Sequence, residues 1–137
     1  RLLKQVPAGF LFMVDVDNFK QTNDTYGHAT GDAILIQTAA AIKSAFRQED
    51  IVGRIGGDEF VIFMQGTSEE ATAAAKAERL MAQLSSREDV ALTLSIGIAA
   101  YPELGASYAE LYQAADQAMY AAKRQGKSSY QLAAKAK

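Results

Sequence analysis

The stretch IVGRIGGDEFVIFM, residues 51–64, decides the fold that the sequence predicts. It holds two apolar runs that are separated by the pair Gly56-Gly57. Glycine pairs supply the positive φ angles of tight hairpin turns, so the pattern predicts two antiparallel strands. The acidic residues Asp58 and Glu59 follow the turn at once, which places two carboxylates at the tip of the hairpin.

The segment before this hairpin also ends in an acid. Residues 9–14, GFLFMV, are apolar and are followed directly by Asp15. A short continuous apolar run of this kind is typical of a strand that is buried on both faces. If a right-handed crossover makes this strand parallel to the first hairpin strand, and the second hairpin strand lies between them, Asp15 lies beside Asp58 and Glu59.

The remaining chain alternates helical and strand patterns. The further elements that we expect are a helical turn with a loop (17–28), an amphipathic helix (31–46), a helix opened by a Thr67–Glu70 capping box and ending near Ser85, a strand with one buried face (91–100), a helix opened by a Ser107–Glu110 capping box and ending near Gly126, and a short strand (129–132). The predicted order is β-α-β-β-α-β-α-β. This order is typical of an α+β fold with a mainly antiparallel sheet flanked by helices.

Composition excludes several classes of protein. With 137 residues, of which 49% are hydrophobic, residues 1–137 are expected to form a single domain around one core. The absence of cysteine excludes a disulfide framework and a thiolate nucleophile, and favours a cytoplasmic location. The 14 basic and 16 acidic residues give a net charge of −2, which argues against a broad surface for nucleic acid.

Two expectations concern the surroundings of this domain. The longest apolar run, residues 9–14, is far too short to span a bilayer, so we expect no membrane contact by this part of the protein. The first residue is Arg1 rather than Met, and we therefore expect the chain to be a fragment of a longer multidomain protein.

Three converging carboxylates need a counter-charge. Because Asp15, Asp58 and Glu59 would repel one another, they favour either protonation or a bound cation. The carboxylates of Asp15 and Asp58, together with a backbone carbonyl such as that of Val16, are the kind of oxygen ligands that Mg²⁺ prefers. Asp17 is better explained as the N-cap of the following helix.

Several polar residues have both a structural and a functional interpretation. Asn23 offers a donor and an acceptor and Asp32 accepts two hydrogen bonds, a pattern that matches the N1–H and 2-amino edge of guanine. Loop capping by Asn23 and a helix-dipole contact of Asp32 explain them equally well. Gly56-Gly57 serves either a turn or the close approach of a nucleotide. His28, the single histidine, is expected to make a structural hydrogen bond rather than bind a metal.

The basic residues near the C-terminus leave a similar choice. Lys123 and Lys127 stand at the end of the last predicted helix, where basic side chains are favourable partners of the helix dipole. The alternative is that they reach a triphosphate. Arg47 and Asp50, after the 31–46 helix, have no distinctive pattern on their own.

Five segments, in this order, carry a family resemblance: residues 15–28 (DVDNFKQTNDTYGH), 31–32 (GD), 54–60 (RIGGDEF), 95–97 (SIG) and 115–123 (ADQAMYAAK). Together they resemble the GGDEF family of diguanylate cyclases. The resemblance implies a palm-like fold with a ferredoxin-like core that binds one GTP per protomer and joins two GTP into cyclic di-GMP with release of pyrophosphate. It also implies a homodimer, because the attacking 3′-hydroxyl must come from the GTP of a facing protomer.

The resemblance implies roles for the acidic residues by position. Asp15 and Asp58 would be the carboxylate ligands of Mg²⁺ or Mn²⁺, assisted by the carbonyl of Val16. Glu59 would either activate the 3′-hydroxyl or complete the metal site, and the sequence leaves both roles open. A metal held in this way would lower the pKa of the attacking hydroxyl and offset charge on the phosphoryl oxygens.

The resemblance also implies contacts with the substrate. Asn23 and Asp32 would read the guanine base, and Leu35 would line the base pocket. Lys123 would contact phosphate, and Lys20 would lie near the triphosphate. These residues would together bind one GTP molecule.

Further roles concern the turn and the product. Gly56 and Gly57 would let the substrate approach the backbone. Arg47 and Asp50, together with Arg79, would form an inhibitory site for the product, because the planar fork of arginine can grip a guanine edge and a phosphate. We therefore expect feedback inhibition by cyclic di-GMP.

The chain departs from the family pattern at three places, of which the smallest is Asn18, one of several residues seen at that position. Lys127 stands after Gly126 where the family often has arginine, which keeps the charge but loses the planar fork. The usual lead-in before Phe10, which connects the domain to an upstream sensor domain, is absent.

A non-catalytic module that binds GTP or cyclic di-GMP is the alternative function, but the intact segment 56–60 favours the enzyme. Asp32 argues against a cyclase for adenine nucleotides.

Overall fold

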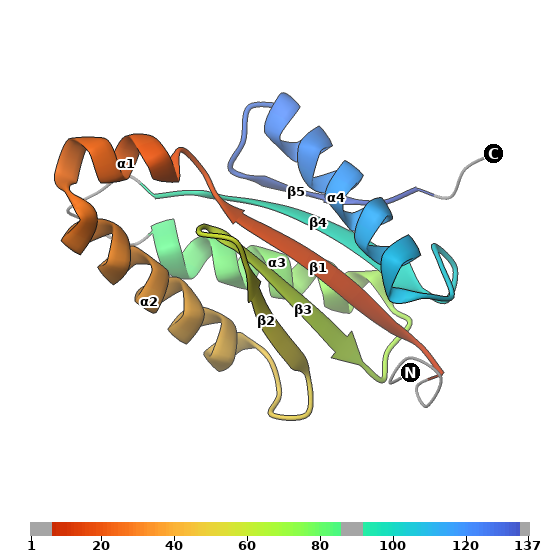
Figure 1. Ribbon diagram of the computed structural model, residues 1–137. Coiled ribbons are helices and arrows are strands. Elements are labelled where there is room, and N and C mark those ends of the chain that lie inside the picture. The colour runs from red at the N-terminus through yellow and green to blue at the C-terminus, as the bar shows by residue number, and fades with distance from the viewer. Residues whose placement is uncertain (1–6, 86–91, 135–137) are drawn as a thin grey trace.

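The computed structural model describes residues 7–85 and 92–134 of the chain (Figure 1). Its elements are, in order, β1 (Gly9–Val16), α1 (Phe19–Tyr26), α2 (His28–Ala45), β2 (Ile51–Ile55), β3 (Glu59–Gln65), α3 (Glu70–Ser85), β4 (Leu94–Tyr101), α4 (Tyr108–Arg124) and β5 (Ser129–Leu132). The strands form one sheet in the order β2-β3-β1-β4-β5. Neighbouring strands are antiparallel except β4 and β5, which are parallel.

This topology confirms the predicted α+β fold with a mainly antiparallel sheet. β3 lies between β1 and β2 and is antiparallel to both, so β1 and β2 are parallel to each other, as expected from the sequence. The register pairs the end of β1 with the start of β3. No helix in the described ranges, 7–85 and 92–134, is long and apolar enough to cross a membrane.

The core consists of two apolar layers, one on each face of the sheet. Every residue of β1 is buried, because side chains of alternating direction meet helices on both sides. One face packs on α2 and α3 through residues that include Phe10, Phe12, Ile34 and Leu80. The other face packs on α4, which covers β1 and β4 (Figure 1).

The structure corrects the sequence prediction at four places. Residues 17–28 contain a complete helix, α1, rather than a single helical turn, and α2 begins at His28 rather than at residue 31. Strand β4 is buried on both faces instead of one, and residue 91, where that strand was expected to begin, lies outside the described residues. Thr67 Oγ1 accepts a hydrogen bond from the backbone N–H of Glu69 at 3.2 Å, and α3 begins only at Glu70.

Other local predictions are confirmed. Ser107 and Glu110 form a reciprocal capping box at the start of α4. The helix ends at Arg124, and Gly126 follows with a φ of 111°, the left-handed region that glycine reaches without steric cost.

Strand β4 is buried on its second face because small residues let α4 approach closely. A Cβ atom on Gly97 would overlap the carbonyl oxygen of Ala115 and would lie 3.0 Å from the Cα atom of Met119. Backbone atoms of a packed helix cannot move aside as a side chain can. Glycine at position 97 therefore sets the distance between α4 and the sheet.

We predict that Gly97→Ala destabilises the domain by about 1 to 3 kcal/mol, the usual cost of overpacking a core. Urea unfolding followed by circular dichroism measures this change in the free energy of unfolding. Gly57→Ala is the matched control, because nothing lies within 4 Å of a Cβ atom there and its φ lies outside the left-handed region. Equal stability of the two variants would contradict the packing argument.

Candidate functional site

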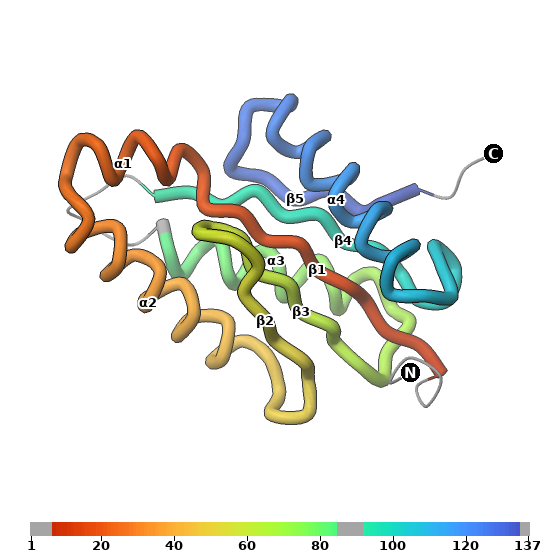
Figure 2. The backbone as a smooth tube through the Cα atoms, in the orientation of Figure 1, coloured from red at the N-terminus to blue at the C-terminus, as the bar shows by residue number. Residues whose placement is uncertain are grey.

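Acidic residues from two separate segments meet at one end of the sheet. Asp15, near the end of β1, is the register partner of Glu59 at the start of β3. The backbone N–H of Val16 donates to the carbonyl oxygen of Asp58 at 3.1 Å, which joins β1 to the hairpin turn. We call Asp15, Asp58 and Glu59 the acidic corner. The backbone trace in Figure 2 shows the end of β1 and the β2–β3 turn together at this end of the sheet.

The electrostatics of the acidic corner are dominated by burial. Asp15 is 3% exposed, and its Oδ1 atom has no hydrogen-bond partner among the described residues. Burial raises the pKa of Asp15 to about 6, and the charges of Asp58 and Glu59 add to this effect. Burial also raises the pKa of Glu59, with further contributions from Asp58 and from Asp116 on α4. The raised pKa values of Asp15 and Glu59 mean that the ionised carboxylates are less favourable here than in water.

One cation of the protein already reaches this corner. The Nζ atom of Lys123, in the last turn of α4, forms an ion pair with Oδ2 of Asp15. Burial alone would lower the pKa of Lys123, but the hydrogen bond and the charge of Asp15 outweigh it and raise this pKa. One ammonium group faces three carboxylates, so the corner keeps an unbalanced negative charge.

The acidic corner fits a divalent cation in its donor chemistry. Asp15 contributes a buried oxygen that has no hydrogen-bond partner in the part of the chain described, and the Asp58 carboxylate and the Val16 carbonyl are hard oxygen ligands that can be added. Within residues 7–85 and 92–134, no three Asp, Glu or His side chains lie close enough together to hold a metal ion by themselves. Mg²⁺ typically binds to one or two carboxylates and completes its shell with water and substrate phosphates, so this donor set is sufficient.

Asp17 has a different role from the predicted N-cap. Its carboxylate accepts hydrogen bonds from the hydroxyl groups of Thr93 at 2.7 Å and Ser95 at 2.6 Å, and from the backbone N–H of Ser128 at 3.0 Å. The N-cap of α1 is Asn18, whose side chain makes no capping hydrogen bond. Asp17 therefore joins β1 to the start of β4 and to the loop after α4.

Three residues at this junction, from the β1–α1 turn and the loop after α4, have an energetically unfavourable backbone conformation. Asn18, Lys127 and Ser128 have φ angles of 56°, 64° and 47°, a region that residues other than glycine rarely adopt. Lys127 donates from Nζ to Oδ1 of Asn18 at 2.6 Å. Lys127 is thus engaged with the β1–α1 turn in this structure.

A pocket of about 340 Å³ adjoins the hairpin. It is lined by Asp32, Leu35, Ile36, Ala39, Arg54 and Phe60. These residues come from α2, β2 and β3, so the pocket lies between the helix and the hairpin. Its volume is within the range of pockets that bind small molecules. The structure thus brings the predicted residues Asp32 and Leu35 into one pocket.

Asn23 lies near this pocket but does not line it. It is half-buried on α1, and its Oδ1 atom is buried without a hydrogen-bond partner among the described residues. Its carboxamide packs against Gly31 of α2, the residue before Asp32. Lys20 and His28 are exposed, on α1 and at the first position of α2.

The turn between β2 and β3 is open to solvent. Gly56 has a φ of 70°, which explains glycine at that position. Gly57 has no such angle, and a Cβ atom there would meet nothing within 4 Å. Arg54 donates from Nη2 to the Gly57 carbonyl at 2.8 Å and closes the turn. Nothing inside the described protein requires glycine at position 57.

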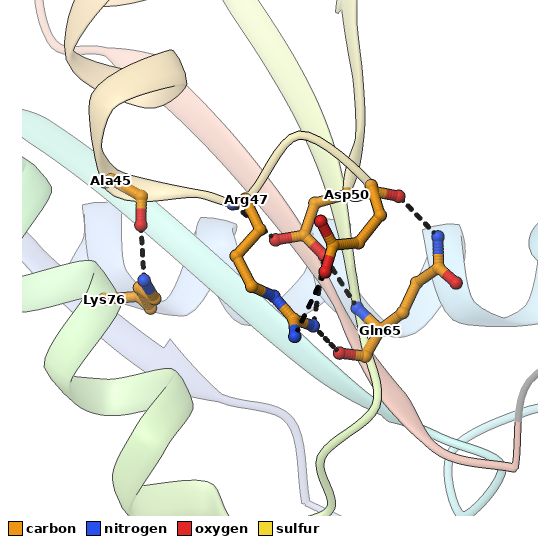
Figure 3. A network of polar contacts seen from close by, with 6 residues as sticks. Ala45, Arg47, Asp50, Gln65 and Lys76 are labelled. Atoms are coloured by element: carbon orange, nitrogen blue, oxygen red, sulfur yellow. Dashed lines mark hydrogen bonds and ion pairs between the residues drawn. The ribbon is translucent and has the colours of Figure 1, made fainter.

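A second polar cluster closes the loop between α2 and β2 (Figure 3). The buried carboxylate of Asp50 accepts the backbone N–H groups of Arg47 at 2.9 Å and Gln65 at 3.1 Å. The Arg47 guanidinium donates to the Gln65 carbonyl and pairs with Glu49 at 3.3 Å and Asp50 at 3.7 Å. Asp50 therefore also has a structural role.

Two further contacts complete this region. Lys76 on α3 donates to the carbonyl of Ala45 at the end of α2 (Figure 3). Its Nζ atom also lies 5.6 Å from the centre of the Phe46 ring. Arg79 is exposed on α3, and no hydrogen bond or ion pair in the described part of the chain connects it to Arg47 or Asp50.

Sequence reasoning missed the partners of Asp17 and the fit of Asn23 against Gly31. Thr93, Ser95 and Ser128 are far from Asp17 in the chain, with separations of up to 111 residues. For Thr93 and Ser95, the only sequence feature that indicated such partners is the presence of small polar side chains at the start of a buried strand. Gly31 lies inside a helix, where glycine is unfavourable, and this could have indicated that another group packs closely against position 31.

Comparisons with known proteins agree with this architecture. The family described as "Diguanylate cyclase, GGDEF domain" matches residues 3–129. The chain is 46% identical over 125 residues to the bifunctional diguanylate cyclase/cyclic di-GMP phosphodiesterase MucR of Pseudomonas aeruginosa, which covers 88% of this chain. It spans 18% of the length of MucR and 30% of that of the diguanylate cyclase TpbB from the same species.

Solved structures show the same fold. The isolated GGDEF domain of TpbB superposes with a TM-score of 0.86 and 38% identity, covering 96% of this chain and 79% of that one. The GGDEF domain of DgcB from Caulobacter crescentus, solved in complex with c-di-GMP, superposes with a TM-score of 0.83 and 29% identity, covering 92% of this chain and 78% of that one. The family model thus matches almost the whole chain, and the structure forms the acidic corner at the hairpin that carries the family's motif. This chain therefore belongs to the GGDEF domain family of diguanylate cyclases.

Proposed function

We propose that this domain joins two molecules of GTP into cyclic di-GMP and releases pyrophosphate. The observation that carries the proposal is the continuity of residues 54–60: Arg54 and Phe60 line the pocket, the glycine turn is open, and Asp58 and Glu59 belong to the acidic corner. A base in the pocket would therefore have its phosphates near the carboxylates. The names of the relatives, several of them diguanylate cyclases, support the same activity.

The acidic corner would hold the cation and the attacking group. Asp15, Asp58 and the Val16 carbonyl would ligate Mg²⁺ or Mn²⁺, which supplies charge neutralisation at the phosphoryl oxygens when bound. Glu59 has a raised pKa, which favours its acceptance of a proton from the 3′-hydroxyl. Completion of the metal site is the alternative role of Glu59, but in the described ranges Asp15, Asp58 and Glu59 do not form a group that could hold an ion by itself, which favours the role as a base.

The pocket would select guanine. Asp32 lines it and can accept two hydrogen bonds from the N1–H and 2-amino groups of the base. Asn23, close by, has a buried Oδ1 atom that accepts no hydrogen bond from the described residues, and Leu35 supplies an apolar wall. A buried acceptor without a partner is costly unless a ligand satisfies it. These features favour guanine over adenine, which lacks both donors.

Lysines would bind the phosphates. Lys123 pairs with Asp15, and its ammonium group is available to phosphate oxygens once Asp15 is neutralised in another way. Lys20 is exposed on α1, and Lys127 is held by Asn18 at the loop after α4. Lys127 would add positive charge rather than the bidentate grip of an arginine.

Catalysis would require two facing protomers. One pocket and one acidic corner hold one GTP, so the second 3′-hydroxyl must come from another copy of the domain in an antiparallel homodimer. We further propose that residues 1–137 act as one catalytic domain of a longer protein in the cytoplasm, under an upstream sensor domain. The small share of MucR and TpbB that the chain spans supports the multidomain arrangement.

The decisive experiment offers the concentrated domain an equal mixture of GTP and ATP with Mg²⁺ and separates the products by chromatography. We predict cyclic di-GMP alone, with a rate per protein that rises with protein concentration.

Asp58→Ala should lower turnover by about 100-fold or more, because removing an electrostatic catalytic group has effects of this size. It should leave thermal unfolding almost unchanged. Adenine-containing products, or full activity of Asp58→Ala, would refute the assignment.

Divalent cations should stabilise the domain through the acidic corner. We predict that Mg²⁺ raises the melting temperature of the wild type, with about 2.7 kcal/mol gained at a concentration of 100 times Kd. Asp15→Asn should abolish this response, because it removes the buried carboxylate. Asp24→Asn, an exposed acid on α1, should retain it. Differential scanning fluorimetry measures both, and an equal response of the Asp15 variant would argue against the site.

Product inhibition would act through Arg47 and Asp50, with Arg79 as a second arginine. We predict that Arg47→Ala weakens cyclic di-GMP binding by about tenfold or more, the effect of losing charge-assisted hydrogen bonds. Glu49→Gln is the control, because it removes the ion-pair partner at 3.3 Å but keeps the guanidinium. Calorimetric titration compares the three proteins. Equal affinities for wild type and Arg47→Ala would exclude the site.

A further inference from the structure

Gly31 is a buried glycine in the first turns of α2, and its missing side chain leaves room for Asn23. A Cβ atom on Gly31 would have its three nearest neighbours in the Asn23 side chain, with Cγ at 2.7 Å, Nδ2 at 3.3 Å and Oδ1 closer still. Apart from atoms of its own residue and its chain neighbours, a real Cβ atom essentially never has a heavy atom within 3.0 Å. The carboxamide of Asn23 can therefore occupy its position only while residue 31 is glycine.

From this contact we propose that Gly31 is a positioning residue for base recognition: it holds the Asn23 carboxamide against α2, next to Asp32, where both can read guanine. The inference rests on the proposed function, because it needs Asn23 to contact the base. Gly31 itself touches no substrate and acts through Asn23.

Among residues 7–85 and 92–134, no hydrogen bond to Oδ1 explains the position of the Asn23 side chain. Its Oδ1 atom is buried and without a partner in the part of the chain that the structure describes. Its backbone carbonyl accepts the N–H of Gly27 at 2.8 Å, which fixes the turn between α1 and α2 but not the side chain. The space over Gly31 is therefore what lets the carboxamide lie in this position.

The consequence of filling this space differs from that at Gly97. At Gly97 the obstructing atoms belong to the backbone of α4, which cannot move alone. At Gly31 they belong to the far end of a flexible side chain, and rotation of Asn23 about its side-chain bonds relieves the overlap. Alanine is also a better helix former than glycine, so the fold of α2 is not endangered. A substitution at Gly31 should thus alter recognition without unfolding the protein.

The test measures nucleotide selectivity in Gly31→Ala, Asn23→Ala and the double variant. The probes are 3′-deoxy-GTP and 3′-deoxy-ATP with Mg²⁺, which lack the attacking hydroxyl, and titration calorimetry gives both dissociation constants. We expect Gly31→Ala to lower the preference for guanine about fivefold or more, the effect of one hydrogen bond, as Asn23→Ala does. In the Asn23→Ala background, Gly31→Ala should change this preference by less than about twofold.

Controls separate positioning from structural damage. Ser44→Thr adds one methyl group to the exposed side of α2 and should keep the wild-type preference. Melting temperatures should show that Gly31→Ala is at least as stable as the wild type, since Asn23 rather than the backbone gives way. A variant that fails to fold would overturn the inference, because the overlap would then not be relieved by Asn23.

The outcomes distinguish this inference from the proposed function. If Asn23→Ala lowers the guanine preference and Gly31→Ala does not, the positioning role is refuted while base recognition by Asn23 stands. If the two effects add in the double variant, Gly31 acts by another route and the inference is again refuted. If Asn23→Ala leaves the preference unchanged, or the wild type prefers neither nucleotide, the assignment of Asn23 as a guanine reader fails, and the role of Gly31 fails with it.

Discussion

The pairing of β1 with β3 is the constraint on which the site depends. It places Asp15 opposite Glu59 and joins Val16 to Asp58, so the fold itself forces like charges together. The buried carboxylate of Asp15 is tolerated because Lys123 reaches it from α4. A protein built only for stability would gain from replacing such a cluster by apolar side chains. Its presence at an open turn next to a pocket is the physical argument for a functional site.

The two glycine-dependent contacts show how the same residue type serves different ends. Gly97 lets the backbone of α4 approach the sheet, and this approach carries Lys123 towards Asp15. Gly31 instead makes room for the Asn23 side chain, whose Oδ1 atom has no hydrogen-bond partner in the ranges that the structure describes. One glycine controls the packing of whole elements, and the other controls the direction of a single carboxamide. The two contacts therefore differ in kind, because backbone atoms oppose a side chain at position 97 and side-chain atoms oppose it at position 31.

Much of the fold and the acidic corner could be predicted from the sequence, because they depend on local patterns. The apolar run before Asp15 and the glycine turn before Asp58 define two strand ends, and only a few topologies can connect them. The second buried face of β4 could not be predicted, since Ser95, Gly97 and Ala99 form no apolar pattern until α4 covers them. Asp17 was misassigned as a cap because the partners of its carboxylate come from β4 and the loop after α4.

The junction at Asp17 has a consequence for the order in which the domain becomes complete. Ser128 and Lys123 follow Asp17 and Asp15 by more than 100 residues in the chain. Contacts of such long range form late in folding, because distant segments must first be brought together. The carboxylate of Asp15 therefore gains its neutralising lysine only after β1 and the end of α4 have come together.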